Sequence, residues 1–246
     1  MNDKNTETMR YNSRALDVLS KENYMSHNKS KEYLKAGENH YRKMLSNITI
    51  GSKVLEIGAG MGENTLCLLE GGSTVCATDI SSKSVMVMEK KFGRYENFSA
   101  RVADMENLPF PNSSFDVVCS AGALSYGDNR IVRNEIYRVL KSGGLFIGLD
   151  SLNHNPIYKL NRYIHFLKGR RTKNTLLRMP TQDLIDSYTF QFGSSEVKYF
   201  GSLLWTTVLL KWFFDKKTIL TLIDYFDTLI NVKKSAFKFT IRVFKS

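Results

Sequence analysis

The sequence contains little of what marks fibrous, disulfide-bonded or exported chains. It holds four prolines among 246 residues, and no internal repeat or low-complexity block interrupts it. The polar N-terminus, MNDKNTETMR, lacks the apolar segment of a signal peptide, so export is not expected. The three cysteines are odd in number, have no metal-ligand spacing and lie in or beside apolar runs, which predicts reduced core thiols in a cytoplasmic protein: Cys67, Cys76 and Cys119.

Long apolar runs are scarce as well. The stretch SLLWTTVLLKWFF at 202–214 is shorter than the roughly 20 residues that a helix needs to span a bilayer, and Lys211 interrupts it. A second apolar stretch, KKTILTLIDYFDTLI, follows at 216–230. Three interpretations of these segments are open: helices that cover the core, the face of a homodimer, and a peripheral contact at the inner face of a membrane.

Positive charge is concentrated in the last part of the chain. The net charge is +11. Residues 151–246 hold 16 Lys and Arg against 6 Asp and Glu, whereas residues 1–150 hold 19 against 18. A local positive field favours an anionic partner such as a phosphate, a nucleotide-linked molecule or a membrane surface. A solvated, well-charged surface is the alternative explanation.

Short apolar runs alternate with amphipathic stretches between residues 53 and 150. Because the runs lack strict alternation, they fit strands that are buried on both faces and joined by helical crossovers. The sequence predicts one doubly wound, mostly parallel, seven-stranded α/β domain over 1–246, with an N-terminal helical cap at 1–48, the core at 49–150, and helices with the last two strands at 151–246. The predicted strands are 54–57, 74–78, 99–103, 115–120, 145–149, 196–200 and 237–244.

The sharpest local pattern is VLEIGAGMGENT at 54–65, where a strand runs into a glycine-rich turn and a helix begins near Glu63 or Asn64. Glycines let backbone approach a ligand closely and adopt positive φ. The Gly-x-Gly-x-Gly spacing differs from the Gly-x-Gly-x-x-Gly of dinucleotide sites, and the preceding Glu56 disfavours a pyrophosphate. A cation fits better beside Glu56. The sulfonium and α-ammonium groups of S-adenosylmethionine are both positive.

Two further acids follow predicted strands. Asp79, in VCATDIS, is placed to accept hydrogen bonds from ribose hydroxyls, and Asp104, in RVADMENLPF, from an adenine amino group. Ile80 and Met105 would enclose the adenine ring. Each aspartate taken singly is equally well explained as a helix N-cap. Together with Glu56, however, they are acids at the ends of successive strands, which meet at one edge of a parallel sheet, and this favours a ligand site.

Four segments resemble the successive motifs of class I S-adenosylmethionine-dependent methyltransferases, in particular the small-molecule branch of ubiquinone and menaquinone methylases: VLEIGAGMGENT, ATDIS, VADMENLPFPNSSFDVVCS and EIYRVLKSGGLFIGLD. The likeness covers about 100 residues in order. It implies S-adenosyl-L-methionine as the cofactor and an antiparallel last strand. It also implies contacts to the methionine part, the ribose, the adenine and the sulfonium from Glu56, Gly58, Ala59, Gly60, Gly62, Asp79, Ile80, Asp104, Met105, Ser120 and Ala121.

The acceptor side departs from those relatives, because Ser125 and Tyr126 stand where a His-Trp pair is often found. Transfer from a sulfonium needs no metal, but it needs an in-line nucleophile and the exclusion of water. For a hydroxyl acceptor we expect His154 as general base, Asp150 as its neighbour or substitute, and Tyr126 as a positioning group. A surface-loop histidine is the alternative for His154. Tyr11 is a candidate for covering the methyl donor.

The acceptor is expected to be a small molecule or glycan that bears phosphate. The segment NPIYKLNRYIHFLKGRRTKNTLLRMP resembles accessory regions of methyltransferases found with bacterial surface-polysaccharide synthesis. We therefore predict O-methylation of a hydroxyl in a sugar, nucleotide sugar or glycan. Because guanidinium groups pair well with phosphate oxygens, the expected phosphate-binding residues are Arg170, Arg171, Lys173 and Arg178.

Other functions stay open. C- or O-methylation of an isoprenoid quinone or another lipid-like molecule would be favoured by an apolar tunnel lined by Trp205, Trp212 and Phe213. A binding protein without catalysis and a nicotinamide-dependent oxidoreductase are further alternatives, which cofactor binding would distinguish. A nucleic acid acceptor is not expected, because no base-reading motif such as Asn-Pro-Pro-Tyr follows the fourth predicted strand.

Overall fold

The computed structural model describes most of the chain. It covers residues 3–21, 35–169, 171–203 and 233–246, and between 203 and 233 it covers 206, 210, 212–215, 218, 219, 221–223 and 225. Three residues named above, Arg170, Trp205 and Lys211, lie outside the described residues. The same is true of much of the apolar region between 202 and 230, whose three interpretations stay open.

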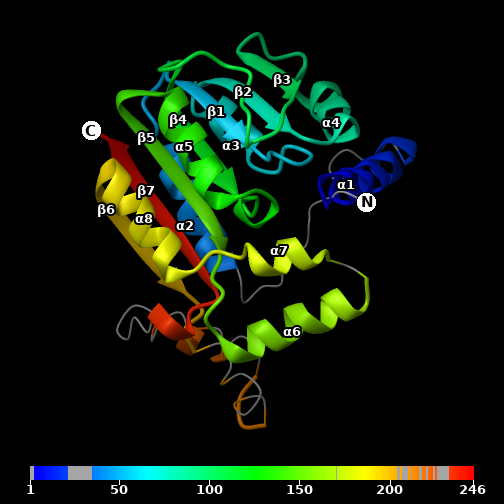
Figure 1. Cartoon of the computed structure of the whole chain (residues 1–246), viewed down its shortest axis with the longest axis vertical. Helices are drawn as coiled ribbons and strands as arrows, with labels where there is room; N and C mark the ends of the chain where they lie inside the picture. Colours follow the sequence, from blue (N-terminus) through cyan, green and yellow to red (C-terminus); the bar gives the residue numbers. More distant parts are fainter. Residues whose placement is uncertain are drawn as a thin grey trace.

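Seven strands of the described chain form one sheet (Figure 1). The first five run parallel, and the last is antiparallel to both of its neighbours. The order across the sheet is β3-β2-β1-β4-β5-β7-β6, which confirms the predicted doubly wound, mostly parallel α/β fold. The strands are β1 (Lys53–Ile57), β2 (Thr74–Asp79), β3 (Phe98–Val102), β4 (Phe115–Ala121), β5 (Leu140–Ser151), β6 (Gly193–Phe200) and β7 (Lys238–Lys245).

Helices cover both faces of the sheet because consecutive apolar residues of a strand point to opposite sides. In β1, Val54 packs into one hydrophobic cluster, whereas Leu55 and Ile57 pack into another. The first cluster includes residues of α2 (Lys35–Ser46), α3 (Thr65–Glu70) and α4 (Ser82–Phe92). The second includes residues of α5 (Asn129–Val139) and α8 (Gln182–Phe192).

The fifth strand is longer than its apolar run predicted. It begins at Leu140, which pairs with Phe115, and it continues through the Lys-Ser-Gly-Gly segment before the run at 145–149. The register between β4 and β5 shifts between Phe115 and Val117. Glycine and serine there resemble a turn in the sequence, but the irregularity of the pairing accommodates them within the strand.

Three helices lie beyond the carboxyl ends of the parallel strands (Figure 1): α1 (Asp3–Ser20), α6 (Pro156–Leu167) and α7 (Lys173–Leu177). α1 is tied to both sides of this edge. The Oγ1 of Thr175 in α7 donates to Oε1 of Glu7 at 3.1 Å, and the Oγ of Ser81 donates to Oδ1 of Asn12 at 2.7 Å. The N-terminal segment therefore covers the strand ends, while the proposed three-part division of the domain stays a prediction.

The described part of the chain holds no helix with both the length and the apolar character needed to cross a membrane. The side chains of Trp212 and Phe213 are 79% and 81% exposed. An internal apolar tunnel built on these two aromatic residues is therefore not present among the described residues.

The packing of α8 on the sheet gives a test of the fold. The ring of Phe146 in β5 is fully buried and stacks on Tyr188 of α8 with centroids 5.2 Å apart. We expect Phe146→Ala to lower the free energy of unfolding by about 3–5 kcal/mol, because it leaves a cavity in the core. Phe190→Ala on the same helix is the matched control, since Phe190 is 93% exposed, and it should change stability by no more than about 0.5 kcal/mol. Urea unfolding followed by circular dichroism measures both, and equal losses would contradict this packing.

Candidate active site

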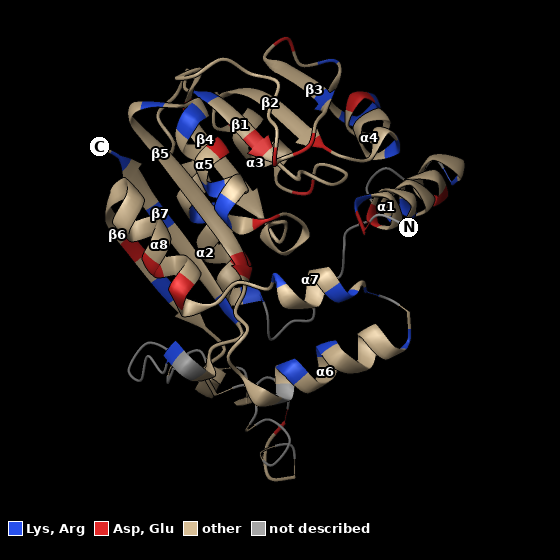
Figure 2. Ribbon diagram, viewed as in Figure 1, with Lys and Arg blue, Asp and Glu red and all other residues tan. Residues whose placement is uncertain are grey.

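A cavity of about 1560 Å³ opens at the carboxyl ends of the parallel strands. Its lining includes residues at the ends of β1, β2, β4 and β5, and residues of α1 and α6 on the other side. Figure 2 shows acidic residues at the strand ends and basic residues on α6 and α7 across from them. Ordinary small-molecule pockets measure roughly 300–1,000 Å³. The cavity is therefore large enough for two small molecules.

The glycine-rich turn forms one wall of this cavity. Gly58, Gly60 and Gly62 all have positive φ, between 60° and 80°. A Cβ at Gly58 would lie 2.4 Å from that of Ala123, and one at Gly62 would lie 2.4 Å from the ring of Phe92. Only glycine adopts a positive φ readily and leaves out the Cβ, as Gly58 and Gly62 require. The three glycines and Ala59 between them all line the cavity, and the following helix begins at Thr65, slightly later than predicted.

Glu56 lies fully buried at the end of β1 and also borders the cavity. Its Oε2 accepts a hydrogen bond from the Oγ1 of Thr65 at 2.6 Å. Burial raises the pKa of Glu56 to about 8, and the neighbouring carboxylates Glu63 and Asp79 add to the rise. A positively charged group in the cavity would favour the ionised form of this side chain.

Asp79 connects the end of β2 to the glycine-rich turn. Its Oδ2 accepts from the backbone N–H of Gly60 at 2.9 Å and its Oδ1 accepts from that of Ser81 at 2.8 Å. Burial raises the pKa of Asp79, although these two bonds oppose the rise. The N-cap of α4 is Ser81, so Asp79 does not cap that helix. Asp79 and the adjacent Ile80 both line the cavity.

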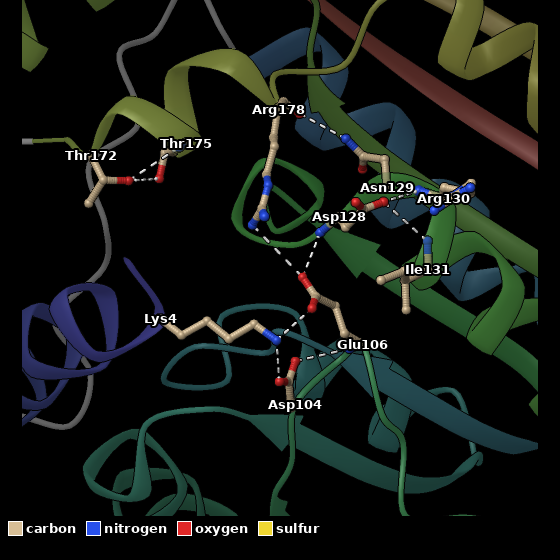
Figure 3. Close-up of polar contacts among 10 residues, drawn as sticks. All are labelled: Lys4, Asp104, Glu106, Asp128, Asn129, Arg130, Ile131, Thr172, Thr175 and Arg178. Carbon is tan, nitrogen blue, oxygen red and sulfur yellow. Dashed lines mark hydrogen bonds and ion pairs between the residues drawn. The ribbon is translucent and has the colours of Figure 1, made fainter. Parts of the chain in front are cut away.

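Asp104 lies at the same edge after β3, but a lysine already binds it (Figure 3). The Nζ of Lys4 in α1 is 2.5 Å from Oδ2 of Asp104 and 2.6 Å from Oε2 of Glu106. The other oxygen of Asp104 accepts from the N–H of Glu106 at 3.0 Å. Asp104 and Met105 line the cavity. No local pattern indicated Lys4, because it is 100 positions away from Asp104.

Glu106 holds three separate segments together at this edge (Figure 3). Besides Lys4 of α1, its carboxylate accepts from the backbone N–H of Asp128 at 2.6 Å and lies 3.8 Å from an Nη of Arg178. Arg178, expected to bind phosphate, is therefore paired with a carboxylate. Its backbone carbonyl also accepts from the side-chain amide of Asn129. Glu106 was not predicted as a site residue.

The end of β4 contributes one of its two expected residues. Ala121 lines the cavity, whereas Ser120 is fully buried and is not among the lining residues. Successive side chains of a strand point to opposite faces, and in β4 it is Ala121 that faces the cavity. The Oγ of Ser120 has no hydrogen-bond partner among the described residues.

Asp150 and Tyr126 meet the cavity beside the end of β5. The buried carboxylate of Asp150 accepts from the backbone N–H of Leu124 at 2.9 Å and from that of Ser151 at 2.6 Å. Burial raises the pKa of Asp150, and its two backbone bonds oppose the rise. The hydroxyl of Tyr126 accepts from Arg10 at 3.2 Å.

Tyr11 of α1 lies edge-on to Tyr126, with ring centroids 5.7 Å apart, and it lines the cavity. An aromatic residue of the N-terminal helix therefore lies against Tyr126 in the cavity wall, and its expected role in covering the methyl donor stays a prediction. Burial raises the pKa of Tyr11 well above its usual value, and the neighbouring Tyr126 adds to the rise. Its phenol therefore stays neutral at physiological pH.

His154 is not brought to the cavity. Its Nε2 accepts a hydrogen bond from the backbone N–H of Gln182 at 2.9 Å, at the start of α8, and it is not among the lining residues. A ring nitrogen that accepts this bond has no lone pair left for a substrate proton. The geometry thus gives His154 a structural contact and does not support it as general base.

Of the basic residues that were expected to bind phosphate, Arg171 lines the cavity, whereas Lys173 does not. Arg162 of α6, which the sequence did not single out, also lines it. An arginine on an amphipathic helix has no local feature that separates a cavity-facing position from a solvent-facing one. Only the placement of α6 beyond the strand ends reveals it.

The part of the chain that forms the strand ends of this cavity is similar in sequence to known proteins. Residues 55–148 match the family model described as a methyltransferase domain. Over 136 residues the chain is 30% identical to the demethylmenaquinone methyltransferase of Tropheryma whipplei, which covers 53% of this chain and 55% of that protein. The chain spans about half the length of the curated relatives it matches.

Solved methyltransferases share the fold. The geranyl diphosphate C-methyltransferase of Streptomyces coelicolor, in complex with Mg²⁺, geranyl diphosphate and S-adenosyl-L-homocysteine, superposes with a TM-score of 0.61 at 14% identity, over 90% of this chain and 86% of that one. The phosphoethanolamine N-methyltransferase 2 of Haemonchus contortus, in complex with S-adenosyl-L-methionine, superposes with a TM-score of 0.57 at 16% identity, over 86% of this chain and 52% of that one. Residues 55–148 of this chain, with the turn and acids that line the cavity, are therefore a methyltransferase domain, and the chain shares its fold with methyltransferases that bind S-adenosyl-L-methionine.

Proposed function

We propose that the protein transfers the methyl group of S-adenosylmethionine to a hydroxyl of a polar small molecule, such as a sugar, a nucleotide sugar or a glycan. The observation that carries the proposal is the set of residues that line the cavity. This lining joins the glycine-rich turn and Glu56 to Asp150, Tyr126 and two arginines. Charged and polar side chains at these positions suit a hydroxylated acceptor better than an apolar one.

The donor would lie along the glycine-rich turn. Glu56 would attract its positive methionine part, and Asp79 would accept from the ribose hydroxyls with the lone pairs that Gly60 and Ser81 leave free. Asp104 would face the adenine together with Met105, and its ion pair with Lys4 would compete with the adenine amino group for the same oxygen. The sulfonium supplies an activated methyl group.

Asp150 is our candidate for the general base. As the acceptor oxygen bonds to the methyl carbon and the carbon–sulfur bond breaks, the hydroxyl proton would pass to the Asp150 carboxylate. The raised pKa of this buried group makes it a better proton acceptor than an ordinary aspartate. Tyr126, whose hydroxyl is held by Arg10, would orient the acceptor. Ala121 and Tyr11 would help to exclude water.

Methylation of an isoprenoid quinone is the second candidate. The similarity to a demethylmenaquinone methyltransferase favours it. The exposure of Trp212 and Phe213 argues against it, since those side chains would have to line an apolar tunnel. Incubation with methyl-labelled S-adenosylmethionine and a panel of nucleotide sugars, glycans and demethylmenaquinone distinguishes the two. Label in the quinone alone would overturn our first proposal, and a protein that binds no S-adenosylmethionine would overturn both.

The pKa of Glu56 predicts how donor binding depends on pH. In the ligand-free protein this pKa is about 8, so binding a cation releases a proton when the pH is lower. The affinity for S-adenosylmethionine should rise by up to about tenfold per pH unit from pH 6 to 8 and level off above. Calorimetry at several pH values measures it.

The control variants are Glu56→Gln, which should remove this pH dependence and weaken binding, and Asp116→Asn. Asp116 lies near the amino end of β4 and bonds to Lys53 and Lys141. Its substitution should leave the pH profile intact. A pH-independent affinity in the unmodified protein would contradict the role given to Glu56.

The assignment of the base predicts opposite results for two neighbouring residues. Asp150→Asn should lower kcat by about 10²–10⁴-fold while the affinity for S-adenosylhomocysteine stays the same. In the unmodified protein, turnover should fall as the pH drops through the raised pKa of Asp150. His154→Ala should keep kcat and cost about 1 kcal/mol of stability, because α8 loses a bond at its first turn. The kcat of both variants is measured on the acceptor that the labelling experiment identifies. A His154→Ala variant that is inactive but folded would restore His154 as the base.

A further inference from the structure

Two arginines stand together in the wall of the cavity at its acceptor end. Arg162 belongs to α6, and Arg171 precedes α7. The Nη2 of Arg162 lies 3.2 Å from the Oγ of Ser151, the residue that follows Asp150. The guanidinium is therefore next to the candidate base.

Contacts with neutral groups fix the direction of Arg162. Besides Ser151, it donates to the hydroxyl of Tyr158, one turn earlier in the same helix. Its Cζ lies 4.6 Å from the centroid of the Tyr158 ring, a distance typical of a cation–π contact. These partners hold the side chain but do not neutralise its charge.

Neither arginine has a counter-ion within the described chain. Among the described residues, no carboxylate oxygen lies within 4.0 Å of a guanidinium nitrogen of Arg162 or Arg171. Burial and the charge of Arg171 lower the pKa of Arg162 to about 10, while Asp150 acts in the opposite direction from a greater distance. A partly buried positive charge without a carboxylate partner is unfavourable. An anion in the cavity would offset that cost.

The other basic residues nearby differ in this respect. Lys238 also lines the cavity, but its Nζ is 2.8 Å from Oε1 of Glu38. Arg178 is paired with Glu106, and Lys4 with Asp104 and Glu106. Arg162 and Arg171 thus lack the carboxylate partner that Lys238, Arg178 and Lys4 have.

We propose that Arg162 and Arg171 form an oxyanion subsite that binds a phosphate or carboxylate group of the methyl acceptor. The acceptor would then be an anionic molecule, with its anionic group at the two guanidinium groups and its reacting hydroxyl at Asp150. Guanidinium groups suit this role because they donate two parallel hydrogen bonds to one oxyanion. The inference rests on the proposed function in assigning the anion to the acceptor.

Inorganic phosphate and acetate serve as probes of the subsite. Each is titrated by calorimetry, at constant ionic strength, into the full chain saturated with S-adenosylhomocysteine. We expect phosphate or acetate to bind, and binding to weaken about tenfold or more in Arg162→Gln and in Arg171→Gln. Binding of phosphate alone would identify a phosphate-bearing acceptor, and preferential binding of acetate a carboxylate-bearing one. Arg130→Gln is the matched control, because Arg130 is exposed and lies outside the cavity.

The remaining outcomes separate this inference from its rivals. Arg162→Lys keeps the charge and should recover part of the lost affinity, which a merely misfolded variant would not do. Equal binding in all variants, or none in the unmodified protein, would overturn the subsite. A loss of affinity for S-adenosylhomocysteine in Arg162→Gln would overturn its assignment to the acceptor, since the arginines would then bind the carboxylate of the cofactor. If the protein binds no S-adenosylhomocysteine, the proposed function fails, and the same titrations of the ligand-free protein still test the subsite.

Discussion

The site depends on carboxylates that are buried at the carboxyl ends of parallel strands and held by nearby hydrogen-bond donors. Asp79 binds two backbone N–H groups, from Gly60 and Ser81, and Asp150 binds two others. A buried carboxylate without such donors would cost several kcal/mol. The loops that supply the donors are therefore constrained to one arrangement. The positive φ of Gly60 is part of that constraint, because it directs the N–H of the turn toward Asp79.

The same edge fixes the N-terminal helix on the sheet. Lys4 pairs with Asp104 and Glu106 near the donor end, and Arg10 donates to Tyr126 near the acceptor end. One helix thus contributes to the walls of both parts of the cavity. Helices α1 and α7 are also bonded to each other through Thr175 and Glu7. This cover gives a physical basis for excluding water from a methyl transfer.

The buried acids and the two arginines lie in different parts of the cavity. Glu56 and Asp79 line it at the glycine-rich turn, where Lys91 also borders it, whereas Arg162 and Arg171 line it together with the buried Asp150. Such a division is complementary to a cationic donor and an anionic acceptor placed side by side. It also explains why the surplus of basic residues after position 150 was informative, although most of the residues first considered for phosphate are paired, remote from the cavity or outside the described chain.

The sequence by itself determined the sheet and the acidic, glycine-rich edge at which we propose that the methyl donor binds. Buried apolar runs fix strands, and the carboxyl ends of parallel strands share one edge, so Glu56, Asp79 and Asp104 were placed together without a structure. Which of the two residues at the end of β4 borders the cavity was harder to foresee. Ala121 does, whereas Ser120 is fully buried and does not.

Only the tertiary structure decided the acceptor end and the cover. His154 looked suited to take a proton, but the N–H of Gln182, 28 positions later, occupies its Nε2. Lys4 reaches Asp104 across 100 positions, and Arg162 faces the cavity because of where α6 lies. The physical reason is common to all three. A local sequence pattern encodes burial and backbone conformation, whereas the partner of a polar side chain depends on which distant segments the fold brings within about 3 Å of it.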